Sequence, residues 1–191
     1  MKSIAIFTSG HSRGTNFVAI YNYLRENHLP IKIEYLLVTD LNAPIVHIAH
    51  NLHICIVQFD NHYRINDFLL SLSKKKPVNL IVLAGFMRKL NKEFISLAGA
   101  PIINIHPSLL PKFGGKGMYG RIVHEAVFEA GEVISGATIH YVNEMYDEGA
   151  VIKQVKCDIT DCHSADDIAQ KVLNLENEIY PKIIVDLIKT M

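Results

Sequence analysis

The sequence predicts an α/β fold with a mainly parallel, Rossmann-like sheet flanked by helices and an antiparallel addition near the C-terminal part. The first observation is that short, β-rich apolar runs alternate with longer segments of helical apolar spacing, which is typical of right-handed βαβ units. The second is that Leu80–Ala84 is continuously apolar and bounded by Gly85, as expected for a strand buried on both faces. The third is a change of pattern after Pro111.

The part of the chain before Pro111 alternates expected strands and helices. In Thr15–His28, the first expected helix, the apolar residues Phe17, Ile20 and Leu24 recur at helical spacing. The expected strands are Ile4–Phe7, Ile31–Thr39, Ile54–Phe59, Leu80–Ala84 and Ile102–Ile105. The further expected helices are Ala43–Leu52, Ile65–Leu72 and Lys92–Leu97.

After Pro111 a glycine-rich loop at 114–117 precedes an expected helix at about Arg121–Glu129. Two expected strands, Ala137–Asn143 and Val151–Lys156, are joined by a turn at 147–149, which is consistent with an antiparallel pair. An amphipathic helix is expected from about Ala165 to Ile188. Since no repeat, low-complexity segment or linker interrupts this pattern, we expect one catalytic domain over residues 1–191.

The composition is that of a packed globular protein, with 49% hydrophobic and 20% charged residues. Lys plus Arg and Asp plus Glu balance at 19 each, so we expect no general affinity for nucleic acid or anionic membranes. No apolar stretch approaches the roughly 20 residues of a spanning helix, and no secretory signal is evident. Three cysteines without a Cys-x-x-Cys pair indicate reduced thiols and a cytoplasmic protein.

The segment from Ser9 to Asn16 follows an expected strand and opens an expected helix. Glycines there let backbone N–H groups approach an anion, and a helix N-terminus favours negative charge. The segment is neither Gly-x-Gly-x-x-Gly nor a P-loop, which disfavours a dinucleotide or nucleoside triphosphate. Two interpretations stay open: a phosphate site, or a plain turn capped by Thr15.

Two more segments place polar side chains at strand ends. Asn104 and His106 are two residues apart, so their side chains share one face of a strand, and an amide beside an imidazole can stabilise an oxyanion. The alternative is a core-facing Asn with a hydrogen-bonded His. Asp147 follows another strand, where it either lies close to His106 and favours the imidazolium, or bonds its own backbone in a turn.

Other chemistries are disfavoured by the motifs. His47, His50 and His53 share one helical flank without an acidic or thiol ligand, so we interpret them as surface residues rather than a metal site. His124-Glu125 does not continue to His-Glu-x-x-His, and there is no Gly-x-Ser-x-Gly elbow of a serine hydrolase.

Taken together, these segments resemble the folate-dependent formyltransferases. The resemblance is carried by Asn-Ile-His-Pro-Ser-Leu-Leu-Pro from Asn104 to Pro111, by Leu83-Ala-Gly-Phe-Met-Arg88 before it, and by Asp147-Glu-Gly149 after it. It runs over nearly the whole chain and is greatest to the purine-synthesis branch. The extent of the chain and Gly14-Thr15-Asn16 favour this branch over those that act on methionyl-tRNA or hydrolyse formyl folate.

The resemblance implies a role for each matching residue. Asn104, His106 and Asp147 match the family's catalytic triad. The positions implied to bind the substrate phosphate and ribotide are Gly14, Thr15, Asn16 and Glu176. The positions implied to form the folate site are Arg64, Met87, Arg88, Lys89, Leu90, Asn143, Glu144, Met145 and Tyr146. It also implies a cis peptide bond between Leu110 and Pro111.

The implied reaction is transfer of the formyl group of 10-formyltetrahydrofolate, the cosubstrate, to the amine of 5′-phosphoribosylglycinamide in de novo purine (IMP) biosynthesis, with no metal. Alternatives on the same scaffold are another amine acceptor or hydrolysis of the formyl folate. Less favoured are a folate-binding protein without turnover and a nucleotide-binding Rossmann domain. Two features depart from the usual family pattern. The Gly-rich loop is two residues longer, with Ser12 and Arg13 extra, and Phe113–Gly120 replaces a Tyr-Pro-Gly form.

Overall fold

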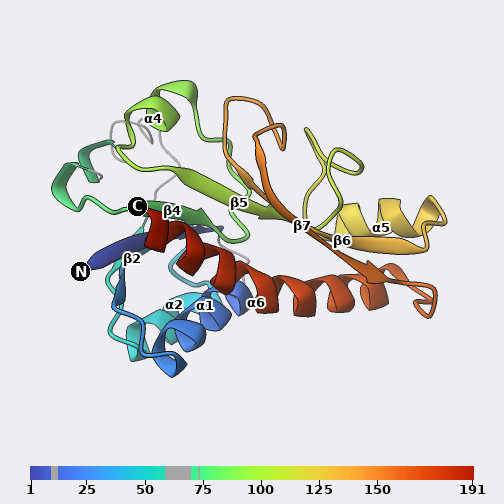
Figure 1. Ribbon diagram of the computed structural model, residues 1–191, viewed down its shortest axis with the longest axis horizontal. Helices are drawn as coiled ribbons and strands as arrows, with labels where there is room; N and C mark the ends of the chain where they lie inside the picture. The colour runs from blue at the N-terminus through green and yellow to red at the C-terminus, as the bar shows by residue number, and fades with distance from the viewer. Residues whose placement is uncertain (10–12, 59–69, 73) are drawn as a thin grey trace.

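The computed structural model describes residues 1–9, 13–58, 70–72 and 74–191. These residues form one seven-stranded sheet in the order β3-β2-β1-β4-β5-β6-β7 (Figure 1). The strands are β1 (Lys2–Thr8), β2 (Ile31–Val38), β3 (Ile56–Gln58), β4 (Leu80–Leu83), β5 (Ile102–His106), β6 (Ile134–Tyr141) and β7 (Val151–Asp158). The helices are α1 (Thr15–Glu26), α2 (Pro44–Asn51), α4 (Lys92–Leu97), α5 (Arg121–Glu129) and α6 (Ala165–Thr190).

The pairing of the strands confirms the predicted fold class. The pairs from β3 to β5 are all parallel, whereas β6 pairs antiparallel with both β5 and β7. Most of the expected helix at 65–72 lies outside the described residues. Its described part, residues 70–72, is helical. None of the described helices is both long and apolar enough to cross a membrane.

The predicted bounds of β6 were wrong at both ends. The strand begins at Ile134 rather than Ala137, because Ile134 and Ser135 pair with the far end of β7. It ends at Tyr141 rather than at Asn143, whose side-chain oxygen accepts a hydrogen bond from Met145 N at 3.0 Å and turns the chain.

Both faces of the sheet are buried, and β1 shows how the sequence divides between them. Ile4 and Ile6 pack with α1, α2 and α6 in one core cluster, while Ala5 and Phe7 pack with α4 in the other. This alternation is the two-residue period of a strand. The long α6 runs along the sheet across α1 and α5, as Figure 1 shows. Helices therefore cover the sheet on both sides, which explains the continuously apolar β4.

The strand order creates a crevice beside β1. From β1 the chain moves outward to β2 and β3, and then crosses to β4 on the other side of β1. In open α/β sheets, ligands bind outside the carboxyl ends of the strands at such a reversal. Of the polar segments identified in the sequence, the one that leads to Asn16 follows β1 and the one with Asn104 and His106 ends β5, so the topology brings these two to one edge of the sheet. Asp147 follows β6, which runs antiparallel to β5.

Candidate active site

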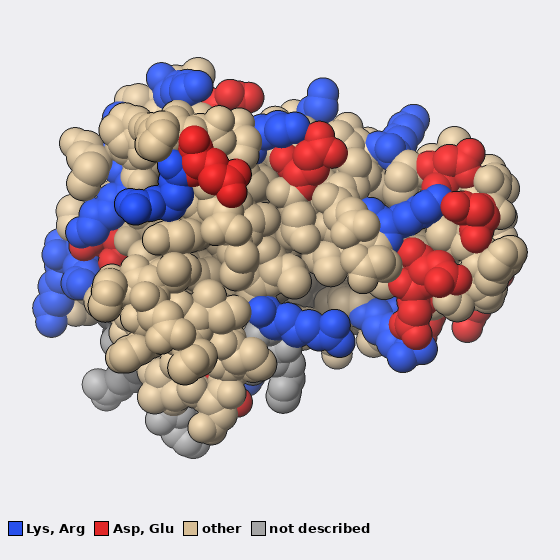
Figure 2. All heavy atoms as spheres, turned by 90° about the horizontal axis from the view of Figure 1, so that it is seen from below, with Lys and Arg blue, Asp and Glu red and all other residues tan. Residues whose placement is uncertain are grey.

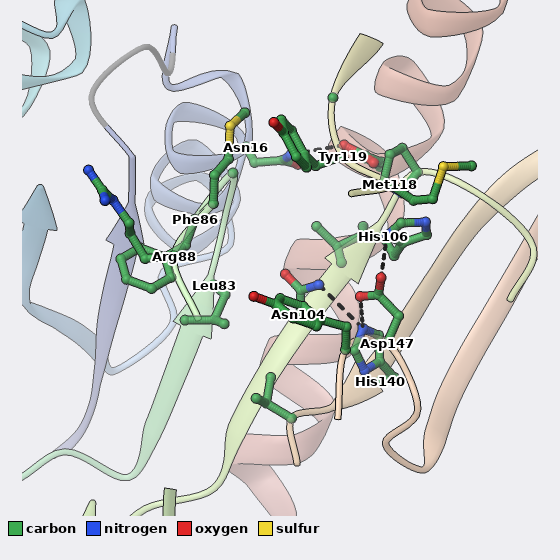
Figure 3. A pocket seen from close by; sticks show the side chains of 18 of the residues that line it. Asn16, Leu83, Phe86, Arg88, Asn104, His106, Met118, Tyr119, His140 and Asp147 are labelled. Carbon is green, nitrogen blue, oxygen red and sulfur yellow. Dashed lines mark hydrogen bonds and ion pairs between the residues drawn. The ribbon is translucent and has the colours of Figure 1, made fainter. Parts of the chain in front are cut away.

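A cavity of about 690 Å³ opens at the carboxyl ends of β4 and β5 (Figure 3). Its size is in the range of small-molecule sites. The segments 85–90 and 142–147, the start of α1, and one side of α6 contribute to its walls. The cavity therefore collects residues from across the chain, as expected for a site at the reversal of strand order.

β5 places two of the predicted catalytic side chains in this cavity. Ile103 and Ile105 belong to the core cluster under α6, so the alternate residues Asn104 and His106 face the other side of the strand. His106 is only 4% exposed. In Figure 3 both side chains point toward Asp147 and His140. The shared face predicted from the two-residue spacing is confirmed.

Asp147 approaches His106 from the loop between β6 and β7. Its carboxylate oxygens lie 3.5 Å from His106 Nδ1 and 3.6 Å from His140 Nε2. Gly115 N donates a hydrogen bond to the same carboxylate at 3.0 Å. Asp147 itself has a left-handed backbone with φ 57°. The carboxylate thus contacts three other segments, which decides between the two interpretations left open by the sequence.

The ring of His106 is held on both sides. Nε2 donates to the Phe113 carbonyl at 2.8 Å, and Nδ1 faces the Asp147 carboxylate. Each ring nitrogen of His106 therefore faces a hydrogen-bond acceptor. The Phe113 contact has no signature in the sequence, since any residue supplies a carbonyl. The preceding Leu110–Pro111 bond is cis, which confirms that expectation.

His140 is a site residue that the sequence reasoning did not single out. It lies opposite Asn104 in the antiparallel pair of β5 and β6. Burial lowers the pKa of His140, outweighing the opposite effects of the Tyr141 carbonyl and of Asp147. The neutral ring donates from Nδ1 to Tyr141 O at 2.9 Å, which leaves Nε2 to accept from Asn104 Nδ2 at 3.3 Å. The His140 ring that contacts Asp147 is therefore neutral, and the contact is not an ion pair.

His124 is a second missed residue. It lies on α5, lines the cavity and is only 7% exposed, and its Nδ1 forms no hydrogen bond with any residue that the structure describes. Burial lowers its pKa to about 4, with a smaller effect of the same sign from His106. His124 is therefore neutral at physiological pH. The sequence around His124-Glu125, which lacks the rest of a metalloprotease motif, did not predict that His124 lies in the cavity.

The residues implied to bind the ribotide lie at the start of α1 and on α6. Thr15, Asn16 and Glu176 line the main cavity, and Gly14 lines an adjoining cavity of about 170 Å³ together with Thr15 and Asn16. Asn16 Nδ2 donates to Glu176 Oε2 at 3.0 Å. Burial raises the pKa of Glu176 to about 7, against the smaller opposing effect of this hydrogen bond.

The implied folate residues form the opposite rim of the cavity. Lys89 Nζ lies 5.0 Å from the centre of the Tyr146 ring, and Lys92 forms an ion pair with Glu144 at 3.1 Å. These contacts connect the two segments that form the rim. The expected folate residues that line the cavity are Met87, Arg88, Lys89, Leu90, Asn143, Glu144, Met145 and Tyr146. Arg64 lies outside the described residues.

In the described part of the chain, no group of three or more His, Cys, Asp or Glu residues is placed to hold a metal ion. Of the three histidines expected on one helical flank, His47 and His50 lie on α2, whereas His53 follows its end with a left-handed backbone. All three are exposed. They do not contribute to the cavity lining.

The chain is similar in sequence and in structure to known formyltransferases. A phosphoribosylglycinamide formyltransferase of Bacillus subtilis is 33% identical over 193 residues, covering 98% of this chain and 95% of the relative. A chloroplastic phosphoribosylglycinamide formyltransferase of Vigna unguiculata is 34% identical over 96% of this chain, which spans 60% of that protein. Glycinamide ribonucleotide transformylase 1 of Geobacillus kaustophilus superposes with a TM-score of 0.87 at 31% identity, covering 98% of this chain and 99% of that one. The family described as formyl transferase matches residues 2–184, and the chain belongs to this family.

Proposed function

We propose that the chain transfers the formyl group of 10-formyltetrahydrofolate to the amine of 5′-phosphoribosylglycinamide, the reaction named for its relatives. The observation that carries the proposal is the meeting of Asn104, His106 and Asp147 in one cavity at the carboxyl ends of the parallel strands. An amide donor, an imidazole and a carboxylate are the groups that acyl transfer to an amine requires.

The proposed roles follow from the contacts. When the amine attacks the formyl carbon, negative charge develops on the formyl oxygen. Asn104 has a second amide proton beyond the one directed at His140, and this proton stabilises that charge. One donor of this kind contributes about 10²–10³ in rate. Asp147 lies against the His106 ring and helps to move a proton from the attacking nitrogen to the departing folate nitrogen. Proton transfer of this kind contributes about 10²–10⁴ in rate.

The Phe113 carbonyl adds a condition to the role of His106. In the structure it accepts the Nε2 proton at 2.8 Å. For His106 Nε2 to donate to the oxygen of the tetrahedral intermediate, its hydrogen bond to the Phe113 carbonyl has to break. Phe113 lies in the glycine-rich segment that differs from the usual family form, so we propose that this segment shifts as the substrates bind.

The cavity suits the two proposed substrates. On the folate side, Phe86, Leu90 and Val142 line the cavity and offer apolar surface that can pack against a flat ring system. The opposite end offers the amides at the start of α1 and the Asn16–Glu176 pair, which suit a sugar phosphate. The arrangement supports small-molecule partners, with the two substrates meeting at Asn104 and His106.

We propose that residues 1–191 form one catalytic domain that acts in the cytoplasm. Cys55, Cys157 and Cys162 are free thiols, which supports a reducing compartment. On the face of the molecule in Figure 2, Lys and Arg side chains are interspersed with Asp and Glu rather than gathered in one broad basic surface. This face gives no support to nucleic acid as a partner.

A spectrophotometric assay with a 10-formyl folate, with and without the ribotide, tests the proposal. We expect turnover only when the ribotide is present. Asp147→Asn should lower kcat by about 10²–10⁴ with little change in folate affinity, while the exposed neighbour tested as Glu148→Gln should keep wild-type turnover. Formate release without any amine would instead identify a hydrolase. An unchanged kcat with lost folate affinity in Asp147→Asn would disprove the assigned role.

A further inference from the structure

The cavity contains basic side chains whose roles can be separated by their partners. Four Lys or Arg side chains line it among the residues that the structure describes: Arg13, Arg88, Lys89 and Arg121. Arg121 forms ion pairs with Glu125 at 2.8 Å and with Asp166 at 3.6 Å. Lys89 lies over the Tyr146 ring. Arg13 and Arg88 form no ion pair with any described residue, so their charges are available to a ligand.

Arg13 and Arg88 approach the cavity from different sides. Arg88 follows β4 on the rim expected to hold folate. Arg13 precedes Gly14, the N-cap residue of α1, and is one of the two residues by which this loop exceeds the usual family form. Arg13 is therefore separated only by Gly14 from Thr15 and Asn16, the positions expected to hold the phosphate.

The start of α1 favours an anion next to Arg13. Within the described part of the chain no side chain caps this helix, and its first turn contains no acidic residue. The first hydrogen bond of the helix is donated by Val18 N to Gly14 O. The backbone N–H groups of residues 15–17 lie in the turn before this bond. Gly14 has a left-handed backbone, and a Cβ there would lie 2.8 Å from Ile45 Cγ1. This close packing against α2 fixes the backbone from which Arg13 projects.

A second, independent feature points to a sugar attached to that anion. Asn16 lines the cavity, and its buried side-chain Oδ1 has no hydrogen-bond partner among the described residues, while Nδ2 donates to Glu176. An unpaired buried acceptor is costly, and a hydroxyl of a ligand can satisfy it. Hydroxyl-binding acceptors thus lie beside anion-binding donors, the combination that a sugar phosphate requires.

We propose that Arg13 is a specificity-determining residue whose guanidinium binds the phosphate of the acceptor at the N-terminus of α1. This inference rests on the proposed function and adds a side-chain cation to its phosphate site. A guanidinium presents paired N–H donors that match two phosphate oxygens, and such charge-assisted bonds are among the strongest in proteins. The extra length of the loop then contributes to substrate selection.

The test compares two acceptors in two enzymes. The acceptors are the glycinamide ribotide and the corresponding riboside, which lacks the phosphate. For Arg13→Ala we expect kcat/KM with the ribotide to fall about 10–100-fold, the usual worth of a hydrogen bond between charged groups. With the riboside, the two enzymes should have equal kcat/KM, and the KM for the formyl folate should not change. Arg13→Lys should recover part of the loss.

Arg25→Ala is the matched control, because Arg25 is an exposed arginine in the last turn of the same helix. It should behave as wild type with both acceptors. An equal loss on ribotide and riboside for Arg13→Ala, or a raised KM for the folate, would overturn the assignment of Arg13 to the phosphate. Equal thermal unfolding temperatures of the variants and wild type exclude misfolding as the cause.

A binding measurement separates this inference from the proposed function. If wild type fails to formylate the ribotide, the proposed function is wrong. Calorimetry with ribose 5-phosphate then tests Arg13 directly. Wild type should bind it about 10–100-fold more tightly than Arg13→Ala. Equal affinity of the two proteins would refute the phosphate contact.

Discussion

At the residue scale, the orientation of Asn104 depends on His140. The neutral imidazole donates its one proton to the Tyr141 carbonyl, so its free nitrogen fixes the Asn104 amide with Nδ2 toward β6. We expect His140→Ala to lower kcat roughly 10–100-fold, because small misplacements of catalytic groups have effects of this size. The KM for the formyl folate should stay within about twofold. Steady-state kinetics measure both, with the exposed His50→Ala as a control that should match wild type.

Glu176 makes stability depend on pH. Burial raises its pKa to about 7, so below pH 7 the folded chain retains a proton that an ordinary carboxyl releases near pH 4. Stability from this group is therefore full at low pH and is lost as pH rises toward and through about 7. Glu176→Gln removes the titration and keeps an acceptor for Asn16. The free energy of unfolding of Glu176→Gln minus that of wild type should rise by an amount on the order of 3 kcal/mol between pH 4.5 and pH 8.

Urea unfolding at several pH values measures this difference. Glu178→Gln is the control, since Glu178 is exposed on the same helix and its hydrogen bond to Lys182 lowers its pKa. That variant should show no rise in relative stability with pH. A constant difference between Glu176→Gln and wild type across the range would mean that Glu176 does not titrate near neutrality in the folded chain.

The residues of the candidate site differed in how visible they were to sequence reasoning. Asn104 and His106 were predictable because alternation within one strand is a local property. The position of His140 depends on the register between β5 and β6, which no local pattern encodes. The Phe113 carbonyl is a backbone group, so residue type carries no information about it. His124 reaches the cavity through the placement of α5, which is a tertiary property.

At the scale of elements, one hydroxyl links α6 to the strand that leads into the site. Tyr180 is fully buried, and its Oη donates to the Leu83 carbonyl at the end of β4 at 2.9 Å. Tyr180→Phe keeps the ring packing and removes this bond together with the longer hydrogen bond of the same hydroxyl to the Ile103 carbonyl at 3.4 Å. We expect the free energy of unfolding to fall by about 1 kcal/mol. Denaturant unfolding at pH 7 measures it.

Tyr21→Phe provides the comparison for Tyr180→Phe. Tyr21 lies partly buried on α1, and its hydroxyl forms no hydrogen bond with a described residue. Its removal should change stability by less than about 0.5 kcal/mol. Equal effects of the two substitutions would show that the Tyr180 hydroxyl does not contribute through its contact with β4.

Helices were located more accurately than strands for a physical reason. α4 and α5 begin and end at the predicted residues. A local signal marks the start of α4, where the Asn91 side chain accepts a hydrogen bond from Phe94 N at 2.8 Å. Gly120 with positive φ precedes α5. Strand ends depend instead on the length of the partner strand. β3 begins at Ile56 rather than at the predicted Ile54, and β6 extends further along β7 than its own pattern indicates.

At the scale of the whole molecule, the cavity joins the two parts of the sheet. One wall comes from α1 and the loop after β4, which belong to the parallel part, and the other from the β6–β7 loop and α5, which belong to the antiparallel part. The alternation of strands and helices predicted a parallel sheet. The order of strands was not predictable from it, because neighbours in the sheet such as β1 and β4 are far apart in sequence.

This arrangement predicts that a bound ligand stabilises the chain as one unit. A folate analogue without the transferable formyl group, at about 100 times its Kd, should add about 2.7 kcal/mol of stability and raise the midpoint of thermal unfolding by roughly 5–10 °C. Calorimetry should show one transition that moves as a whole, since the ligand contacts both parts of the sheet. p-Aminobenzoylglutamate, which lacks the pteridine ring, should shift the midpoint much less at the same concentration. Two transitions, of which only one moves with the analogue, would mean that the parallel and antiparallel parts unfold separately and that residues 1–191 are not one domain.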